Sequence, residues 1–234
     1  MTVLLVVFSL IVLLTADFVV QKKRHKKVGS LAIRAVQNNS PEQWHLSDDI
    51  VFAPNHVWMR RERNNSITMG IDNFLLGLTG VADALVLPRA GEIVGKGFPA
   101  IQLRHKNKTL RIHSPIEGQV LEANVNAEHQ PGLIAGNPYS TGWLFNIVPF
   151  DSAVPLGSFL KGANAIEWLK KQQLSFKEFL SSRLPQLDFV TMQDGGIPVD
   201  GVLKEFNQDV WNEFQARFAS LAPEPETMGE YDNA

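Results

Sequence analysis

The sequence predicts a mainly β protein with helices toward its C-terminal end and one transmembrane helix at its N-terminus. Residues 1–20 are almost uniformly apolar, residues 56–149 alternate short aliphatic runs with turn residues, and the pattern after Pro149 becomes helical. The chain has 234 residues and no cysteine, which excludes disulfides and cysteine-ligated metals. Its net charge of -2 argues against a general nucleic-acid binder.

The first 21 residues are predicted to cross a membrane. Met1–Val20 carries no charge before Asp17, and about 20 residues rising 1.5 Å each cover a hydrocarbon core of roughly 30 Å. Five lysines and arginines follow between Lys22 and Lys27, whereas a cleaved signal peptide has its basic residues first. Because such clusters stay cytoplasmic, we expect a single-pass protein of the inner (plasma) membrane with its N-terminus outside. A buried core helix is the alternative interpretation.

Five segments are expected along the chain. They are a transmembrane helix (1–21), a basic juxtamembrane segment and linker (22–50), a β domain (51–151), a helical extension (152–222) and a disordered acidic tail (223–234). The strands of the β domain are expected in the runs at 66–71, 84–94, 100–103, 110–125 and 142–148, with one short helix near 73–78.

Three helices are predicted in the extension. The first covers Phe159–Gln172, and the second covers Ser175–Leu184 and opens with a capping box of Ser175 and Glu178. The third carries one apolar stripe at steps of three and four, made of Leu203, Phe206, Val210, Phe214, Phe218 and Leu221. We expect this stripe to pack on the β domain, with a groove for a partner as the alternative.

The stretch from Leu103 to Gly118 is predicted to begin as a β-hairpin. Pairing Leu103 with Leu110, and Ile101 with Ile112, directs all four side chains inward and leaves Lys106-Asn107 as a two-residue turn. Asparagine at the second turn position suits a positive φ. Lys106 then shares the tip and Lys108 begins the return strand, although a register slip would bring Lys108 to the tip.

Several separated motifs of the β domain resemble a known family. They are His-Val-Trp at 56–58, the run from Ile71 through Leu87-Pro88 to Gly91, Ser-Pro-Ile-Glu-Gly at 114–118, and Asn-Pro-Tyr-Ser-Thr-Gly-Trp-Leu-Phe at 137–145. In this order they resemble the glycine cleavage system H protein, the lipoyl carrier of that system, over about residues 51–151. The resemblance implies a barrel-sandwich hybrid of two small antiparallel sheets, the fold shared with lipoyl and biotinyl domains.

The same resemblance implies a lipoyl group on a lysine eight residues before the turn proline. Counting back from Pro115 gives Asn107, whose carboxamide cannot be acylated as an amine can, and Arg104 stands where the family has an acidic residue. We therefore expect no lipoyl cofactor. The alternative is a lipoyl carrier of a glycine-cleavage-type multienzyme system that bears lipoate on Lys106 or Lys108.

Positive charge gathers around the predicted hairpin tip. The candidate partner-binding residues are Arg104, Lys106, Asn107, Lys108 and Arg111. They are interpreted either as a solvated hairpin whose charges prevent edge-to-edge pairing, or as a contact for an acidic partner surface. A third hypothesis is a peripheral tether whose basic hairpin rests on anionic lipid headgroups.

No catalytic or metal-binding arrangement is predicted. His56, His105, His113 and His129 lack metal-ligand spacing, and Asp194-Gly195-Gly196 lacks the pattern of a phosphate-binding loop. We therefore expect a non-enzymatic scaffold or accessory subunit of a cytoplasm-facing membrane complex, with a protein partner and no nucleic acid. A redox complex is favoured only by analogy with the settings of lipoyl-type domains.

Overall fold

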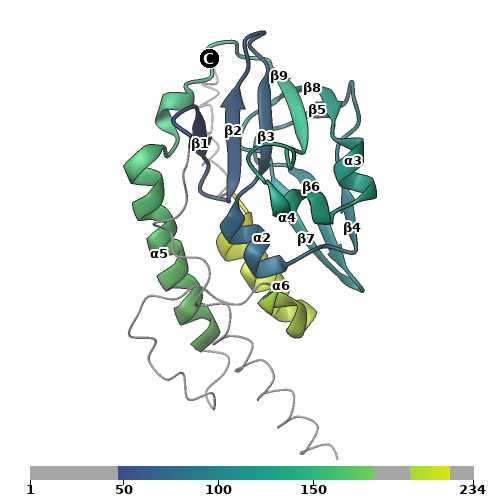
Figure 1. Ribbon diagram of the computed structural model, residues 1–234, viewed down its shortest axis with the longest axis vertical. Helices are drawn as coiled ribbons and strands as arrows, with labels where there is room; N and C mark the ends of the chain where they lie inside the picture. The colour runs from purple at the N-terminus through teal and green to yellow at the C-terminus, as the bar shows by residue number, and fades with distance from the viewer. Residues whose placement is uncertain (1–46, 182–200, 222–234) are drawn as a thin grey trace, which may run out of the picture.

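The computed structural model describes residues 47–181 and 201–221, which form two antiparallel β-sheets and several helices around them (Figure 1). The predicted transmembrane helix, most of the linker, the acidic tail and the Asp194-Gly195-Gly196 turn lie outside these residues. Within the described part of the chain, no helix is both long enough and apolar enough to cross a bilayer.

The larger sheet has six strands in the order β1-β2-β3-β9-β8-β5, and the smaller has three in the order β4-β6-β7. Every described pairing is antiparallel. The strands are β1 (Ile50–Phe52), β2 (Val57–Arg61), β3 (Ile67–Ile71), β4 (Ala84–Val86), β5 (Ile93–Val94), β6 (Pro99–His105), β7 (Lys108–His113), β8 (Gly118–Ala123) and β9 (Phe145–Pro149). The prediction of a mainly β domain with two antiparallel sheets is confirmed.

The main core lies between the two sheets, because alternate residues of each strand point to the same side. Met59 and Met69 from the larger sheet, and Leu103 and Leu110 from the smaller, are fully buried in one cluster. Burying a side chain of this size stabilises the folded state by about 1.5–3 kcal/mol. The same alternation that predicted the inward face of the hairpin therefore builds the core.

A second, smaller cluster lies on the outer face of the larger sheet. Ile50, Phe52 and Trp58 are buried there with Ala165, from helix α5 (Gly162–Ser181). The Trp58 ring lies directly on Gly70, where an added Cβ would come within 2.5 Å of the indole Nε1. Glycine is thus required at this strand position for the ring to pack.

Helix α5 corrects the prediction of two helices in this region. A single helix runs from Gly162 to Ser181, beside β1 (Figure 1), with no break at Ser175. No glycine or proline stands between residues 163 and 181 to end it, and the apolar positions keep one helical period. Ser175 caps no helix; its Oγ instead accepts a hydrogen bond from Arg217. The end of the second predicted helix, at 182–184, lies outside the described residues.

The predicted third helix is broken into three short pieces. A 3₁₀ turn, η4 (Val202–Glu205), is followed by α6 (Gln208–Phe214) and by one π-helical turn, η5 (Gln215–Ala219). The break falls at Asn207, whose side chain caps α6 by accepting the N–H of Val210. The stripe still packs on its own domain, as expected, since Leu203, Phe214 and Phe218 are buried.

A cluster of phenylalanine rings joins helices from three parts of the chain. It contains Phe74 from α2 (Asn73–Thr79), Phe176 and Phe179 from α5, and Phe214 and Phe218. Their ring centroids lie 4.9–6.3 Å apart in stacked and edge-to-face pairs, which adds about 0.5–1.5 kcal/mol per pair beyond burial.

Helix α2 confirms the short helix predicted near 73–78, whereas α3 (Val125–His129), α4 (Gly132–Gly136) and the 3₁₀ turn η3 (Leu156–Ser158) were not predicted.

Tyr139 holds the start of α2 and gives a first stability prediction. Its Oη accepts the N–H of Asn73 at 3.2 Å, while its ring packs edge-on against Phe52 and Trp58. Burial raises the pKa of the hydroxyl, so the group stays protonated. Tyr139→Phe keeps the ring and removes the hydrogen bond, and should lower the free energy of unfolding by about 1 kcal/mol. Urea unfolding of both proteins measures this, and equal stability would refute the role of the hydroxyl.

Candidate functional site

The β6–β7 hairpin has the predicted register. Leu103 pairs with Leu110 and His105 with Lys108, so Lys106 and Asn107 form the two-residue turn. The positive φ of this turn, 53°, belongs to Lys106, which corrects the assignment to Asn107. The amide of Lys106 donates to Asp83 Oδ2 at 2.7 Å, and this hydrogen bond lowers the pKa of the carboxyl.

The five candidate residues of the tip do not share one surface. Arg104, Lys106, Asn107 and Arg111 are exposed, whereas Lys108 is buried with 8% of its surface accessible. Lys108 faces inward because β-strand side chains alternate, and it therefore shares a face with Leu110 and Ile112.

The ammonium of Lys108 is held by backbone carbonyl groups. Its Nζ donates to the oxygen of Lys204 at 2.6 Å and to that of Phe206 at 2.8 Å. The same nitrogen lies 5.2 Å from the ring centroid of Trp211, within the range of a cation–π contact. The pKa of Lys108 is lowered, mainly because the ammonium is buried. The nearby Glu205 carboxylate raises it by a smaller amount. Lys108 is consequently a fixed internal donor.

Residues 201–221, here called the 201–221 segment, cover the free edge of β7. Arg111 donates its backbone N–H to Gln215 Oε1 at 2.8 Å, and the N–H of Leu221 donates to His113 Nδ1 at 3.3 Å. Figure 1 shows α6 beside the smaller sheet, at the end where α2 lies. Unpaired edge strands invite pairing with other chains, and this segment prevents it along β7.

Two glycines allow the 201–221 segment to approach α2 closely. Gly201 donates its N–H to Gly77 O at 2.6 Å. A Cβ at Gly80 would lie 2.8 Å from the Cα of Gly201, and both residues have positive φ, at 64° and 73°. Side chains at these positions would both strain the backbone and push the segment away.

Two histidines lie beneath the same segment. His105 is buried edge-on against Trp211 with ring centroids 5.7 Å apart, and His113 accepts the Leu221 amide. Burial lowers the pKa of both rings, and the Lys204 ammonium lowers that of His105 further. Folding therefore favours the neutral form of both rings.

This burial predicts a loss of stability in mild acid. Below the ordinary histidine pKa of about 6.5 the unfolded chain takes up protons that the folded chain refuses, so the free energy of unfolding falls as pH falls. Urea unfolding between pH 7.5 and 5 should show this decline, and His105→Phe with His113→Gln should flatten it. His129→Gln, at an exposed helix end, serves as the control. A decline unchanged in the double variant would contradict the prediction.

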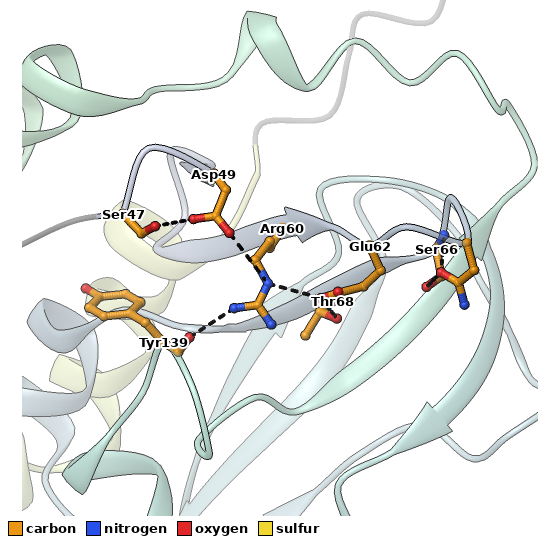
Figure 2. Close-up of polar contacts among 8 residues, drawn as sticks. Ser47, Asp49, Arg60, Glu62, Ser66, Thr68 and Tyr139 are labelled. Atoms are coloured by element: carbon orange, nitrogen blue, oxygen red, sulfur yellow. Dashed lines mark hydrogen bonds and ion pairs between the residues drawn. The ribbon is translucent and has the colours of Figure 1, made fainter.

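A second polar site, absent from the sequence predictions, centres on Arg60 of β2. Its Nε donates to Glu62 Oε1 at 3.0 Å and lies 4.0 Å from Asp49 Oδ2, while Nη1 donates to Tyr139 O at 3.4 Å (Figure 2). Thr68 Oγ1 donates to the same Glu62 oxygen at 2.8 Å. The arrangement fixes a charged network on the outer face of the larger sheet.

One further histidine has structural surroundings. His56 is fully buried, its Nδ1 lies 2.7 Å from Asp72 Oδ2, and Asp72 caps α2 by accepting the N–H of Leu75. Within residues 47–181 and 201–221, no three histidines or carboxylates gather as metal ligands would.

Comparison with known proteins assigns the chain to a family. The family model described as glycine cleavage H-protein matches residues 50–173, more than half of the chain. The chain belongs to the glycine cleavage H-protein family. The glycine cleavage system H protein of Alteromonas mediterranea is 32% identical over 108 residues, covering 46% of this chain and 84% of the relative. The mitochondrial H protein of Pisum sativum is 36% identical over 104 residues, covering 44% and 61%.

A solved H protein from Mycobacterium marinum is also similar, at 22% identity with a TM-score of 0.45. It aligns with 54% of this chain and 98% of its own.

The H-protein family implies a lipoyl group, which would have to be joined to an amine at the hairpin tip. The position that the resemblance assigns to the lipoyl lysine is Asn107, which lies exposed in the turn and offers a carboxamide. Of its neighbours, Lys108 is engaged by two carbonyls, and Lys106 is exposed one position away. The residue at the assigned position therefore does not fit an amide-linked lipoyl group.

Proposed function

We propose that this H-protein family member is a non-enzymatic scaffold or accessory subunit that carries no lipoyl group. The observation that supports it best is the state of the hairpin: the assigned position is Asn107, and the next amine, on Lys108, is bound by the carbonyls of Lys204 and Phe206. A swinging arm needs a free amine at the tip. In this hairpin the amine of Lys108 instead binds the 201–221 segment, which suits a rigid structural role.

The proposal includes an anchor in the inner membrane. The apolar run at 1–21 and the basic run that follows it support a single-pass orientation with the β domain in the cytoplasm. Such an anchor would hold the β domain beside other membrane proteins. A redox assembly is the setting that analogy with lipoyl-type domains favours.

Purification from native membranes in mild detergent tests the scaffold. The full chain should elute with a partner protein at a fixed ratio, and the ratio should persist through a second chromatography step. A chain that elutes alone as a monomer would count against the proposal.

A carrier role through Lys106 is the second candidate function. One observation favours it: Lys106 is exposed in the turn itself. Its amine would reach solvent, although it stands one position before the assigned one. Lipoate found on the native chain, and lost in Lys106→Arg, would establish the carrier instead of the scaffold.

A further inference from the structure

The outer face of the smaller sheet is open and carries two arginines. Leu103 on β6 and Leu110 on β7 point into the main core, so the residues that alternate with them point outward. None of these outward residues is buried in the described part of the chain; they are Gln102, Arg104, Thr109, Arg111 and His113. Among the described residues, this face is therefore open to an occupant.

The two arginines have no acidic partner on this face. Strands β4, β6 and β7 contain no aspartate or glutamate. Arg104 donates to Gln102 Oε1 at 3.3 Å, and neither Arg104 nor Arg111 makes an ion pair within residues 47–181 and 201–221. The carboxylate of Asp83, just before β4, is engaged by the amide of Lys106. Both guanidinium groups are therefore available to carboxylates from elsewhere.

The 201–221 segment leaves the smaller sheet on this same face. The N–H of Leu221 donates to His113 Nδ1 at 3.3 Å, and His113 lies two positions after Arg111 on β7. Two residues of a strand span about 7 Å. Residues 222–234 therefore start close to Arg111, joined to a residue that the structure fixes in place.

Residues 222–234 have the charge that complements this face. They contain no lysine, arginine or histidine. Their four acidic residues are Glu224, Glu226, Glu230 and Asp232. Composition alone predicts disorder for such a segment, but a fixed surface of opposite charge gives it a place to bind.

The spacing of the first two glutamates matches that of the two arginines. Arg111 pairs with Gln102, so Arg104 is its diagonal neighbour on β6, at about 7–8 Å. Glu224 and Glu226 are also about 7 Å apart in an extended chain. The proline at position 225 favours an extended backbone at Glu224. The three residues from Leu221 to Glu224 can span about 10 Å, enough to reach Arg111.

Covalent attachment favours this segment over other acidic occupants. A segment joined directly to Leu221 meets the two arginines at an effective concentration in the millimolar range. Each exposed ion pair is weak and is screened by salt. A few such pairs can therefore hold a tethered segment, whereas they would not retain a free acidic peptide at ordinary concentrations.

We infer that residues 222–234 dock across the outer face of the smaller sheet, with Glu224 at Arg111 and Glu226 at Arg104. The docked segment covers part of the basic hairpin, so an acidic partner that binds these arginines has to displace it. The inference goes beyond the scaffold function and does not depend on it.

Arginine footprinting of the full chain in mild detergent tests the docking. Phenylglyoxal modifies accessible guanidinium groups, and mass spectrometry of the peptides gives the rate at each arginine. Glu224→Gln combined with Glu226→Gln should raise the rates at Arg104 and Arg111 at least about threefold. Raising the salt concentration should do the same in the parent chain, because the ion pairs are exposed.

Two controls accompany this measurement. The rate at Arg63, which is exposed in the β2–β3 turn, should stay the same in all samples. Glu117→Gln combined with Glu122→Gln is the matched variant, since both glutamates are exposed elsewhere on the domain. It should leave the rates at Arg104 and Arg111 unchanged.

The reciprocal variant tests the other side of the contact. Arg104→Gln combined with Arg111→Gln should release the segment, because its glutamates lose their partners. Cleavage after Glu226 by a glutamate-specific protease should then be at least about threefold faster, since proteases cut undocked segments more readily. Arg63→Gln is the control and should leave the cleavage rate unchanged.

Several outcomes would overturn the inference. Footprinting rates at Arg104 and Arg111 that are unchanged in the double glutamate variant would remove the docked segment. Protection that falls on dilution would assign the occupant to a second copy of the chain. Protection that is kept in the glutamate variant and lost when anionic lipid is removed would assign the face to lipid headgroups.

Discussion

Replacing Lys108 by methionine is expected to loosen the 201–221 segment and to lower the free energy of unfolding by about 3 kcal/mol. Methionine fills a similar volume but donates no hydrogen bond. The carbonyls of Lys204 and Phe206 then lose their donor, and Trp211 loses its cation. An internal lysine that only filled space would tolerate the change.

Hydrogen exchange resolved by segment measures this effect directly. Amides of residues 201–221 should open more than about a hundredfold more often in Lys108→Met, the change that 3 kcal/mol implies. Lys106→Met is the matched control, because its side chain is exposed two positions away, and it should stay within about 0.5 kcal/mol of the parent. Protection that is unchanged in Lys108→Met would mean that the two carbonyl contacts do not hold the segment.

Placing a lysine at the hairpin tip should convert this chain into a lipoyl acceptor. Asn107→Lys puts a primary amine in the exposed turn, at the position that the family resemblance assigns to the modified lysine. Co-expression with a lipoate–protein ligase, with lipoate supplied, should leave the parent chain unmodified and join lipoate by an amide to the variant. Intact-mass spectrometry gives the modified fraction.

Two further variants sharpen this experiment. Lys106→Arg added to Asn107→Lys should keep the modification, which assigns it to the new lysine. Arg104→Glu added to Asn107→Lys should raise the modified fraction, since the family has an acidic residue there. Modification of the parent, or none in Asn107→Lys, would show that the residue at position 107 does not decide acceptor function.

The hairpin register could be read from the sequence, whereas the helix boundaries could not. Leu103, Leu110 and their neighbours alternate with polar residues, and one register buries all of them, which is why the pairing was predicted correctly. Ser175 offered a capping box, yet helix α5 runs through it because burial of Phe176 and Phe179 favours a continuous helix. Asn207 interrupts the predicted last helix, because its side chain caps the start of α6, and the apolar stripe concealed this local cap.

The burial of Lys108 had a signal in the sequence. Inward pairing of Leu110 and Ile112 directs Lys108 to the same face by the two-residue period, so its ammonium had to find internal partners. Those partners, the carbonyls of Lys204 and Phe206, lie about a hundred residues later and depend on how the 201–221 segment folds back. The same holds for the Arg60 network, because its partner Tyr139 lies 79 residues later in the sequence.

The mass of the intact chain purified from the membranes of its native host tests the central claim most directly. If the chain carries no lipoate, its measured mass should equal the mass calculated from the sequence, with no adduct on the hairpin. A lipoyl adduct on Lys106 or Lys108 that disappears when that lysine becomes arginine would contradict the claim and make the protein a carrier.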